Sequence, residues 1–345
     1  MPDQRPRRPL IIPIFIPNQG CPHRCIFCQQ EEITGQRTRP VSGRMVQEII
    51  EIAIRSQGFH RATEPEVAFY GGTFTRLPAE KMEELLGAVT PYIHKGYFRS
   101  VRVSTRPDAV NEKQLDRMKH LGVSTVELGA QSMDNRVLEM SRRGHTAGDT
   151  IRAFRLLRKY GFRVGLQLMP GLPGDTETVF MSTISQVIDL HPDMVRLYPA
   201  LVIRGTELEA WYLCGRYRPL SLDVAVRICR EGCMALEGAG IPVIRIGLMS
   251  SPSLREQGAI AAGPWHEAFG FLVRSEIYHR RIAPCLPKPG EAKRIRLKVH
   301  WKEASLLRGH RNSGLRLIEE KTGARIEELS PVKTLGPGEI EVERL

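Results

Sequence analysis

The sequence predicts an α/β fold, namely a partial (β/α)6 TIM-like barrel followed by a small C-terminal α/β domain. Up to about residue 250, short runs rich in Val, Ile and Leu alternate with longer segments whose apolar residues recur at helical spacing. This alternation is typical of βαβ units, which build a parallel sheet covered by helices. Six such units are two short of a closed eight-stranded barrel. The pattern changes after residue 250, which indicates a separate region.

Each predicted strand is a run of β-branched or large apolar residues that ends at glycine, proline or polar residues. We expect strands at 10–17, 66–70, 100–104, 125–129, 163–168 and 194–198, with 243–247 as a further strand. The helices between them are expected at 45–55, 79–90, 111–121, 150–160, 177–190 and 222–239. Because ligands of parallel sheets bind at the carboxyl ends of the strands, we expect the site at the polar and glycine-rich strand exits.

The sequence divides into a barrel over 1–250, a helical extension and linker over 251–290, and a small module over 291–345. The extension is expected to hold a helix from Gly263 to Ile277, before a linker rich in proline. The module is predicted to run strand, helix, turn, helix, strand, strand. Its elements are expected at 294–300, 304–308, 313–322, 325–326 and 339–342.

Composition and charge narrow the class of protein. The chain has 345 residues, of which 41% are hydrophobic and 26% charged, as in a soluble globular protein. The net charge of +12 favours a polyanionic partner, nucleic acid first, although a solvated basic surface is the alternative. The seven cysteines do not suit a disulfide scaffold in a chain of this length. No secretory signal or membrane-spanning run is evident, so we expect a cytoplasmic protein.

Three cysteines, Cys21, Cys25 and Cys28, form a C-x3-C-x2-C run on the loop expected after the first strand. Thiolates at this spacing select zinc or an iron–sulfur cluster. A structural zinc site is closed by four ligands, and His23 is the only nearby candidate for the fourth. A [4Fe–4S] cluster held by three thiolates instead leaves one iron open. The third interpretation is that the three cysteines bind no metal. Of the three interpretations, the spacing favours the iron–sulfur cluster.

The motif, with Phe27 directly before the third cysteine, resembles the radical S-adenosylmethionine (SAM) superfamily. In that family the cluster binds SAM and cleaves it reductively to methionine and a 5′-deoxyadenosyl radical, which abstracts a hydrogen atom from substrate. The resemblance implies a [4Fe–4S] cluster and SAM as cofactors, with an electron donor of the flavodoxin or ferredoxin type. It also implies that Phe27 lies beside the adenine. A loop hydrophobe that covers the cluster would equally explain Phe27.

A Gly-Gly-Thr turn, Gly71, Gly72 and Thr73, follows the second predicted strand. Members of the superfamily have a Gly-Gly-Glu-type turn here, whose backbone binds the methionine amino group. Glycines let backbone carbonyls approach a ligand closely. The resemblance therefore implies a SAM-binding role for the turn, with Thr73 in place of the acidic residue. A plain turn is the alternative.

Further SAM contacts follow from a similarity to enzymes resembling oxygen-independent coproporphyrinogen oxidase. There a glutamine contacts the ribose, and an arginine twelve residues on pairs with the methionine carboxylate. Gln131 and Arg143 have this spacing here, and a planar guanidinium suits a carboxylate. Ser104 and Gln167 stand where that relative carries a glutamate and an aspartate. Both keep a hydrogen-bonding group without the charge.

Three longer segments, 127–132, 143–146 and 197–206, resemble the catalytic subunit of Elongator, which modifies wobble uridine in transfer RNA. That family carries a C-terminal acetyltransferase domain and a long N-terminal RNA-binding extension. The 55 residues of 291–345 are too few for such a domain, so we expect neither it nor acetyl-coenzyme A chemistry. Tyr198, Arg204 and His266 are candidate substrate contacts or structural residues.

The C-terminal module is similar to a KH domain, which clamps single-stranded RNA with a G-x-x-G loop between two helices. Here the loop begins at Gly309, and Asn312 replaces the second glycine. A small cap that packs against the barrel is the alternative interpretation. Two interpretations are open for the basic residues Lys293, Arg296 and Lys298. They form either a strip that faces the phosphates of RNA or the solvated face of a strand.

Three hypotheses follow. The first is a radical SAM enzyme, Elongator-like in its core, that acts on transfer RNA or another anionic substrate. The second keeps the radical chemistry with a small molecule such as a tetrapyrrole. The third is a metal-stabilised RNA-binding protein without enzymatic activity.

Overall fold

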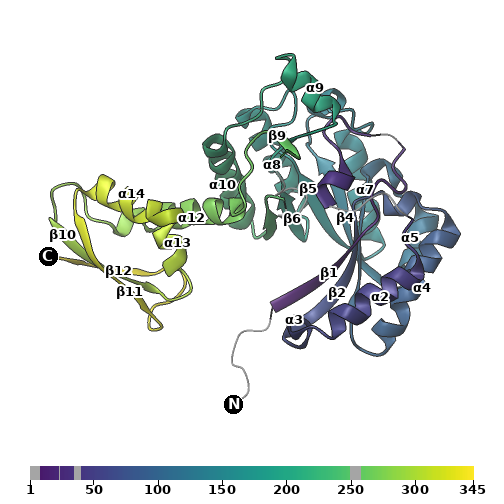
Figure 1. Ribbon diagram of the computed structural model, residues 1–345, viewed down its shortest axis with the longest axis horizontal. Coiled ribbons are helices and arrows are strands. Elements are labelled where there is room, and N and C mark those ends of the chain that lie inside the picture. Colours follow the sequence, from purple (N-terminus) through teal and green to yellow (C-terminus); the bar gives the residue numbers. More distant parts are fainter. Residues whose placement is uncertain (1–7, 23, 35–39, 249–257) are drawn as a thin grey trace. The chain divides into compact units, whose positions relative to one another are not determined.

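The computed structural model describes residues 8–22, 24–34, 40–248 and 258–345 (Figure 1). The chain forms two compact units. The first comprises Met1–Ser221 and Leu236–Trp265, and the second comprises Leu222–Ala235 and His266–Leu345. Among the described residues, no helix has both the length and the apolar character needed to cross a membrane.

A seven-stranded parallel sheet is the framework of the first unit, with strand order β1-β2-β3-β4-β5-β6-β8. It is the curled sheet of a partial barrel, as the alternating sequence pattern predicts, and the further strand at 243–247 joins it as β8. The strands are β1 (Arg8–Phe15), β2 (Ala62–Tyr70), β3 (Ser100–Thr105), β4 (Val123–Gln131), β5 (Arg163–Leu168), β6 (Met194–Leu197) and β8 (Val243–Ile246).

Helices cover the outer face of this sheet (Figure 1). Helix α2 shows why they form: Ser42 caps it by accepting a hydrogen bond from the Met45 N–H group, and Val46 and Ile50 on its apolar side are fully buried. The helices of the first unit are α1 (Gln30–Thr34), α2 (Gly43–Ile54), α3 (Gln57–His60), η1 (Phe74–Arg76), α4 (Ala79–His94), η2 (Pro107–Ala109), α5 (Glu112–His120), α6 (Asn135–Met140), α7 (Ala147–Lys159), α8 (Glu177–Leu190) and α9 (Glu207–Leu213). Helix α10 (Leu222–Gly238) follows, and most of it belongs to the second unit.

The structure differs from the sequence prediction in short elements. The helices α1, α3, α6 and α9 were not expected, nor was the antiparallel pair of β7 (Val202–Ile203) and β9 (Ile260–Ala262). The helix expected from Gly263 begins instead at Phe269, as α12 (Phe269–Ile282). Gly263 has a φ of +114°, outside the helical region, and Pro264 follows it, so the helix cannot begin at this point.

The second unit contains a three-stranded sheet of order β11-β10-β12, in which β10 runs parallel to β11 and antiparallel to β12. Ile295, Leu297 and Val299 of β10 are fully buried and pack in one cluster with Tyr278 and Ile282 of α12. The order strand, helix, turn, helix, strand, strand is the predicted one. Its elements after α12 are η3 (Ala283–Cys285), β10 (Arg294–His300), α13 (Ala304–Arg308), η4 (His310–Asn312), α14 (Ser313–Thr322), β11 (Arg325–Val332) and β12 (Ile340–Arg344).

Candidate active site

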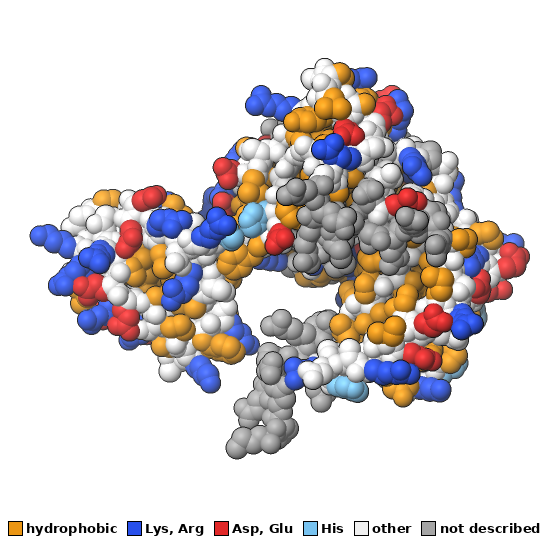
Figure 2. Space-filling model, viewed as in Figure 1, with side chains coloured by type: hydrophobic (Ala, Val, Ile, Leu, Met, Phe, Trp, Pro, Cys, Tyr) orange, Lys and Arg blue, Asp and Glu red, His pale blue; other side chains and the backbone are white. Residues whose placement is uncertain are grey.

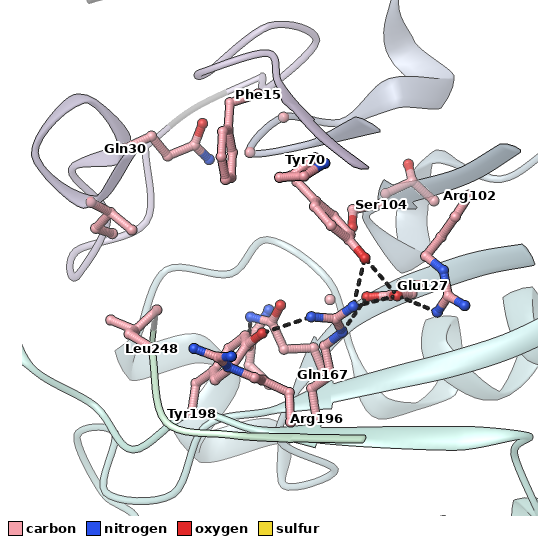
Figure 3. A pocket seen from close by; sticks show the side chains of 18 of the residues that line it. Phe15, Gln30, Tyr70, Arg102, Ser104, Glu127, Gln167, Arg196, Tyr198 and Leu248 are labelled. Carbon is pink, nitrogen blue, oxygen red and sulfur yellow. Dashed lines mark hydrogen bonds and ion pairs between the residues drawn. The ribbon is translucent and has the colours of Figure 1, made fainter. Parts of the chain in front are cut away.

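One pocket of about 1200 Å³ lies within the first unit (Figure 3). Its lining residues come from the strand exits, from the inner side of the sheet and from the beginnings of strands, such as Arg99, Arg163 and Asp193. All eleven site residues predicted from the sequence line it, although what each of them binds stays a prediction. These residues are Cys21, Cys25, Phe27, Cys28, Gly71, Gly72, Thr73, Ser104, Gln131, Arg143 and Gln167.

The cysteine loop is held by backbone hydrogen bonds. After β1, the Ile16 N–H group donates to the Tyr70 carbonyl over 2.8 Å, so the loop leaves the sheet beside β2. The Cys21 N–H group donates to Asn18 over 3.1 Å, and the Cys28 N–H group donates to Cys25 over 3.0 Å. These two turns place the three thiols in one short segment at the pocket wall.

The loop packs against the Gly-Gly-Thr turn that follows β2. The Thr73 N–H group donates to the Gln19 carbonyl over 2.8 Å, and the Thr73 hydroxyl lies 3.3 Å from the Cys21 sulfur. A Cβ atom on Gly72 would lie 2.4 Å from the Gln19 carbonyl oxygen, and one on Gly20 would lie 2.3 Å from that of Thr73. Both glycines are required because two backbone segments meet at this point.

The thiols share one electrostatic environment. Burial, together with the neighbouring Cys25 and Cys21, raises the pKa of Cys28 to about 12 against the opposing effect of Arg143. A metal or cluster that binds here must therefore displace protons. Soft thiol donors that line a pocket fit an iron–sulfur cluster. Among the described residues, no group of three or more His, Cys, Asp or Glu side chains is already arranged as a metal centre, and His23 lies outside those residues.

Arg143 joins the strand exits to the cysteine loop. Its Nη1 atom donates to the Cys25 sulfur over 3.0 Å, and its Nη2 atom donates to the Gly129 carbonyl over 2.6 Å. Its Nε atom is buried without a hydrogen-bond partner among the described residues. A buried arginine beside the thiols and without a carboxylate partner is a suitable site for an anionic group.

His145 is buried near Arg143 and stays neutral. Burial, together with Arg143 and Arg106, lowers its pKa to about 4. Its Nε2 atom lies 3.2 Å from the Ala130 carbonyl oxygen, which fixes the proton on Nε2 because a carbonyl can only accept. His145 therefore supports the exit of β4 and adds no positive charge to the site.

Three polar side chains project into the pocket from consecutive strands. Gln167 of β5 donates from Nε2 to the Gln131 Oε1 atom of β4 over 3.2 Å. Gln131 has a φ of +67°, a left-handed conformation that ends the strand and redirects its side chain. Ser104 of β3 is half-buried at the same wall. Ser104, Gln131 and Gln167 thus line the same pocket, and their role in binding SAM stays a prediction.

Deeper in the pocket lies a buried charged network that the sequence analysis missed (Figure 3). Glu127 of β4 pairs with Arg102 of β3 at 2.7 Å and with Arg196 of β6 at 2.8 Å. Arg102 also pairs with Glu66 of β2 at 2.5 Å. The side chains of Arg102 and Glu127 are only 5% and 4% exposed, so these charges depend on one another for solvation.

Two tyrosines complete this network. The Tyr70 hydroxyl donates to Glu127 over 3.1 Å and accepts from Arg196 over 2.5 Å. Burial, followed by the Glu127 carboxylate, raises the pKa of Tyr70, which keeps the phenol protonated. The Tyr198 hydroxyl accepts from Arg196 over 3.1 Å, and no described residue accepts its own proton. Tyr198 can therefore donate to a ligand in the pocket.

A signal for this network was present in the sequence. Arg102, Glu127 and Arg196 are single charges between large apolar residues in strands of a parallel sheet. Such residues cannot face the helices and must pair inside the barrel. Of the three candidate substrate contacts, Tyr198 lines the pocket and His266 belongs to the second unit, while Arg204 is not among the described residues that line the pocket.

The fold and the thiol-lined pocket define a class of enzyme that holds a cluster at the strand exits of a partial barrel. Residues 15–187 match the radical SAM superfamily, and residues 192–279 match the Radical_SAM C-terminal domain. The chain belongs to the radical SAM superfamily, whose members bind a [4Fe–4S] cluster and SAM, and it is an enzyme. The hypothesis of a non-enzymatic RNA-binding protein is therefore wrong.

Within the superfamily the chain is Elongator-like. It is 30% identical over 257 residues to a tRNA uridine(34) acetyltransferase of Methanocaldococcus jannaschii, covering 63% of this chain and 47% of that protein. It is 32% identical over 185 residues to the mouse Elongator complex protein 3, covering 47% of this chain and 33% of that protein. The chain thus spans about half the length, or less, of these relatives.

The structure of archaeal Elp3 from Methanocaldococcus infernus has the same fold. It superposes with a TM-score of 0.60 at 24% identity, over 79% of this chain and 63% of that one. The partial barrel predicted from the sequence is confirmed.

Proposed function

We propose that this radical SAM enzyme modifies a nucleoside of transfer RNA. The observation that carries the proposal is the similarity, over 257 residues, to an enzyme whose name refers to uridine 34 of tRNA. The net charge of +12 agrees with a polyanionic substrate. Because the match covers 47% of that relative, its acetyl transfer is not carried over to this chain.

In this proposal Cys21, Cys25 and Cys28 hold the cluster. When bound, the cluster and SAM supply a 5′-deoxyadenosyl radical. Arg143 binds the methionine carboxylate, because its guanidinium is buried beside the cysteine loop and has no carboxylate partner among the described residues. The backbone at Gly71, Gly72 and Thr73 binds the methionine amino group.

The remaining contacts orient the nucleoside part of SAM. Phe27 packs beside the adenine, since it lies between the second and third cysteines at the pocket wall. Ser104, Gln131 and Gln167 bind the ribose by neutral hydrogen bonds.

The inner end of the pocket receives the substrate. Glu127 is saturated by Arg102, Arg196 and Tyr70, so it offers little accepting capacity to a ligand. The Tyr198 hydroxyl donates instead, and it suits a carbonyl oxygen such as those of a uracil ring. The buried ion pairs of Glu127 with Arg102 and Arg196 thus exclude water around the reacting base. The Tyr198 hydroxyl holds one polar group of the base in position.

The proposal is tested by comparing nucleosides of tRNA from cells with and without the gene, by liquid chromatography and mass spectrometry. We expect one modified nucleoside to be missing from the deletion strain and restored by the wild-type gene but not by the Cys25→Ala gene. Identical profiles in all strains would contradict the tRNA substrate and favour a small molecule. The electron donor, proposed as a flavodoxin or ferredoxin, is identified by which reduced protein supports SAM cleavage in place of dithionite.

A further inference from the structure

Basic and acidic side chains are interspersed over the visible face of both units (Figure 2). On β10, for example, Arg294, Arg296 and Lys298 pair with glutamates of the neighbouring strands at 2.7, 3.7 and 3.2 Å. Arg296 and Lys298 thus belong to an ion-paired, solvated strand face, which is one of the two interpretations open for the basic strip. Positive charge without a local counter-charge is found instead inside the pocket of the first unit.

Among the described residues, each carboxylate that lines this pocket is already paired with an arginine. The pairs are Glu64–Arg99, Glu66–Arg102, Glu127–Arg102, Glu127–Arg196 and Asp193–Arg158. Arg245 of β8 lines the pocket as well, but no described carboxylate forms an ion pair with it. Its charge is therefore left over when the charges of the pocket wall are balanced.

The Arg245 side chain is half-buried and extends along β8, the edge strand of the sheet. Its Nε atom donates to the carbonyl of Gly247, two residues further on, over 3.2 Å. The guanidinium therefore points toward the carboxyl end of β8. Its two Nη groups have no hydrogen-bond partner among the described residues. A partly desolvated cation without a counter-charge is costly, and such a group in a pocket indicates a site for an anionic ligand.

A register shift between β6 and β8 turns Arg245 into the pocket. Val195 of β6 pairs with Val243 of β8. The next residue of β6, Arg196, pairs with Arg245, so one residue of β8 is extra at this point. Without the shift Arg245 would pair with the fully buried Leu197, whose side chain lies on the opposite face of the sheet from Arg196. Irregularities of this kind re-aim side chains beside binding sites.

The neighbouring strand presents a second free donor at this wall. Arg196, the register partner of Arg245, donates to the Tyr198 hydroxyl over 3.1 Å (Figure 3). Arg196 is itself neutralised by Glu127 at 2.8 Å, so it attracts no further anion. The wall formed by β6 and β8 thus offers a neutral hydroxyl and one uncompensated guanidinium on adjacent strands. These groups suit a base carbonyl and a phosphate, which a nucleotide joins through a single ribose.

We propose that Arg245 binds the phosphate of the nucleotide whose base is modified. The inference deepens the proposed function and rests on it. A planar guanidinium presents paired N–H donors that match two phosphate oxygens. The pocket accordingly recognises a nucleotide rather than a base alone, with the base at Tyr198 and the phosphate at Arg245. A carboxylate of a small molecule would use the same donors, and a separate arm of the test distinguishes it from phosphate.

The test measures binding of uridine, uridine 5′-monophosphate and uridine 3′-monophosphate to cluster-loaded protein with SAM, by anaerobic titration calorimetry. The variant is Arg245→Gln, and the matched control is Arg163→Gln. Arg163 also lines the pocket and has no carboxylate partner among the described residues, but its side chain is exposed at the beginning of β5. Both variants lower the net charge equally. Thermal unfolding verifies that both fold.

We expect the wild type and Arg163→Gln to bind one of the monophosphates about tenfold to a hundredfold more tightly than uridine. Arg245→Gln is expected to bind that monophosphate and uridine alike. Arg245→Lys retains part of the preference, because it keeps the charge without the paired donors. A purely structural role of Arg245 would weaken all three ligands together. That result, a preference that survives in Arg245→Gln, or one lost equally in Arg163→Gln would overturn the inference.

Further arms separate this inference from the proposed function. If the wild type modifies tRNA from the deletion strain but shows no Arg245-dependent preference for a monophosphate, only this inference fails. If tRNA profiles are identical in all strains while the preference depends on Arg245, the proposed substrate fails and a free nucleotide takes its place. Thermal stabilisation by acetate but not by inorganic phosphate, lost in Arg245→Gln, would assign a carboxylate to Arg245 and overturn the phosphate.

Discussion

The Arg143 guanidinium donates a hydrogen bond to the Cys25 sulfur over 3.0 Å, although 118 residues separate them in the chain. The strand exit of β4 and the cysteine loop are thereby joined at the point where the methionine end of SAM is proposed to bind. The same guanidinium also donates to Gly129, so its position is set from two sides.

Replacing Arg143 by Lys is expected to weaken SAM binding to the cluster-loaded protein about tenfold to a hundredfold, because a paired, charged contact contributes roughly 1.5–3 kcal/mol. Equilibrium dialysis with SAM measures this. Arg142→Lys is the matched control, since its exposed side chain pairs with Glu207. Equal affinities of the two variants would contradict the role of Arg143.

Gly72→Ala is expected to destabilise the cysteine loop, because the added methyl group meets the backbone oxygens of Gln19 and Ile16 at 2.4 and 2.7 Å. The expected cost is about 1–3 kcal/mol, seen as a lower unfolding midpoint and a lower iron content after reconstitution. Gly87→Ala, on the exposed side of α4 with no atom near its Cβ position, is expected to stabilise the protein by about 0.5–1 kcal/mol. A Gly72→Ala protein that retains iron and stability would show that the two loops do not pack as described.

Glu127→Gln is expected to reduce the free energy of unfolding by about 3–5 kcal/mol, since it leaves Arg102 and Arg196 buried without their shared carboxylate. Urea denaturation measures the loss. Glu112→Gln, at an exposed pair with Lys159, is expected to change stability by less than about 1 kcal/mol. Similar values for both variants would mean that the interior network contributes nothing.

The contribution of His145 to stability is expected to be lost as the pH drops from about 6.5 to about 4, whereas Asp175, whose pKa burial raises to about 6, acts in the opposite direction in both the wild type and a His145 variant. Folded His145 takes up a proton only near its pKa of about 4, whereas in the unfolded chain it does so near 6.5. The unfolded state therefore binds more protons in this window, and the loss amounts to at most roughly 3 kcal/mol. His145→Gln, which can still donate to Ala130, is expected to flatten this part of the pH profile of the unfolding midpoint. An unchanged profile would show that His145 titrates normally.

The sequence could predict the cysteine motif and the parallel sheet because both are local. The spacing of Cys21, Cys25 and Cys28 lies within eight residues, and the strand pattern repeats. The positions of Gly71, Gln131 and Arg143 followed from their place at strand exits and from family resemblance. The structure brings all of them to one pocket.

The interior network could not be fully predicted because it depends on strand register. Ser104 and Glu127 are register partners between β3 and β4, and Gln167 and Arg196 are partners between β5 and β6. A shift of one residue would move each side chain to the other face of the sheet. The sequence shows that such charges must pair, but not that Arg102 and Arg196 share Glu127.

The central claim is that three thiols hold a [4Fe–4S] cluster in this pocket. Its most direct test is the iron and acid-labile sulfide content of anaerobically reconstituted protein, compared with Cys→Ala variants at 21, 25 and 28 and with Cys214→Ala, an exposed cysteine outside the pocket. We predict equal amounts of iron and sulfide in wild type and in Cys214→Ala, with loss in each motif variant. Zinc without iron or sulfide, or clusters retained in the motif variants, would contradict the account.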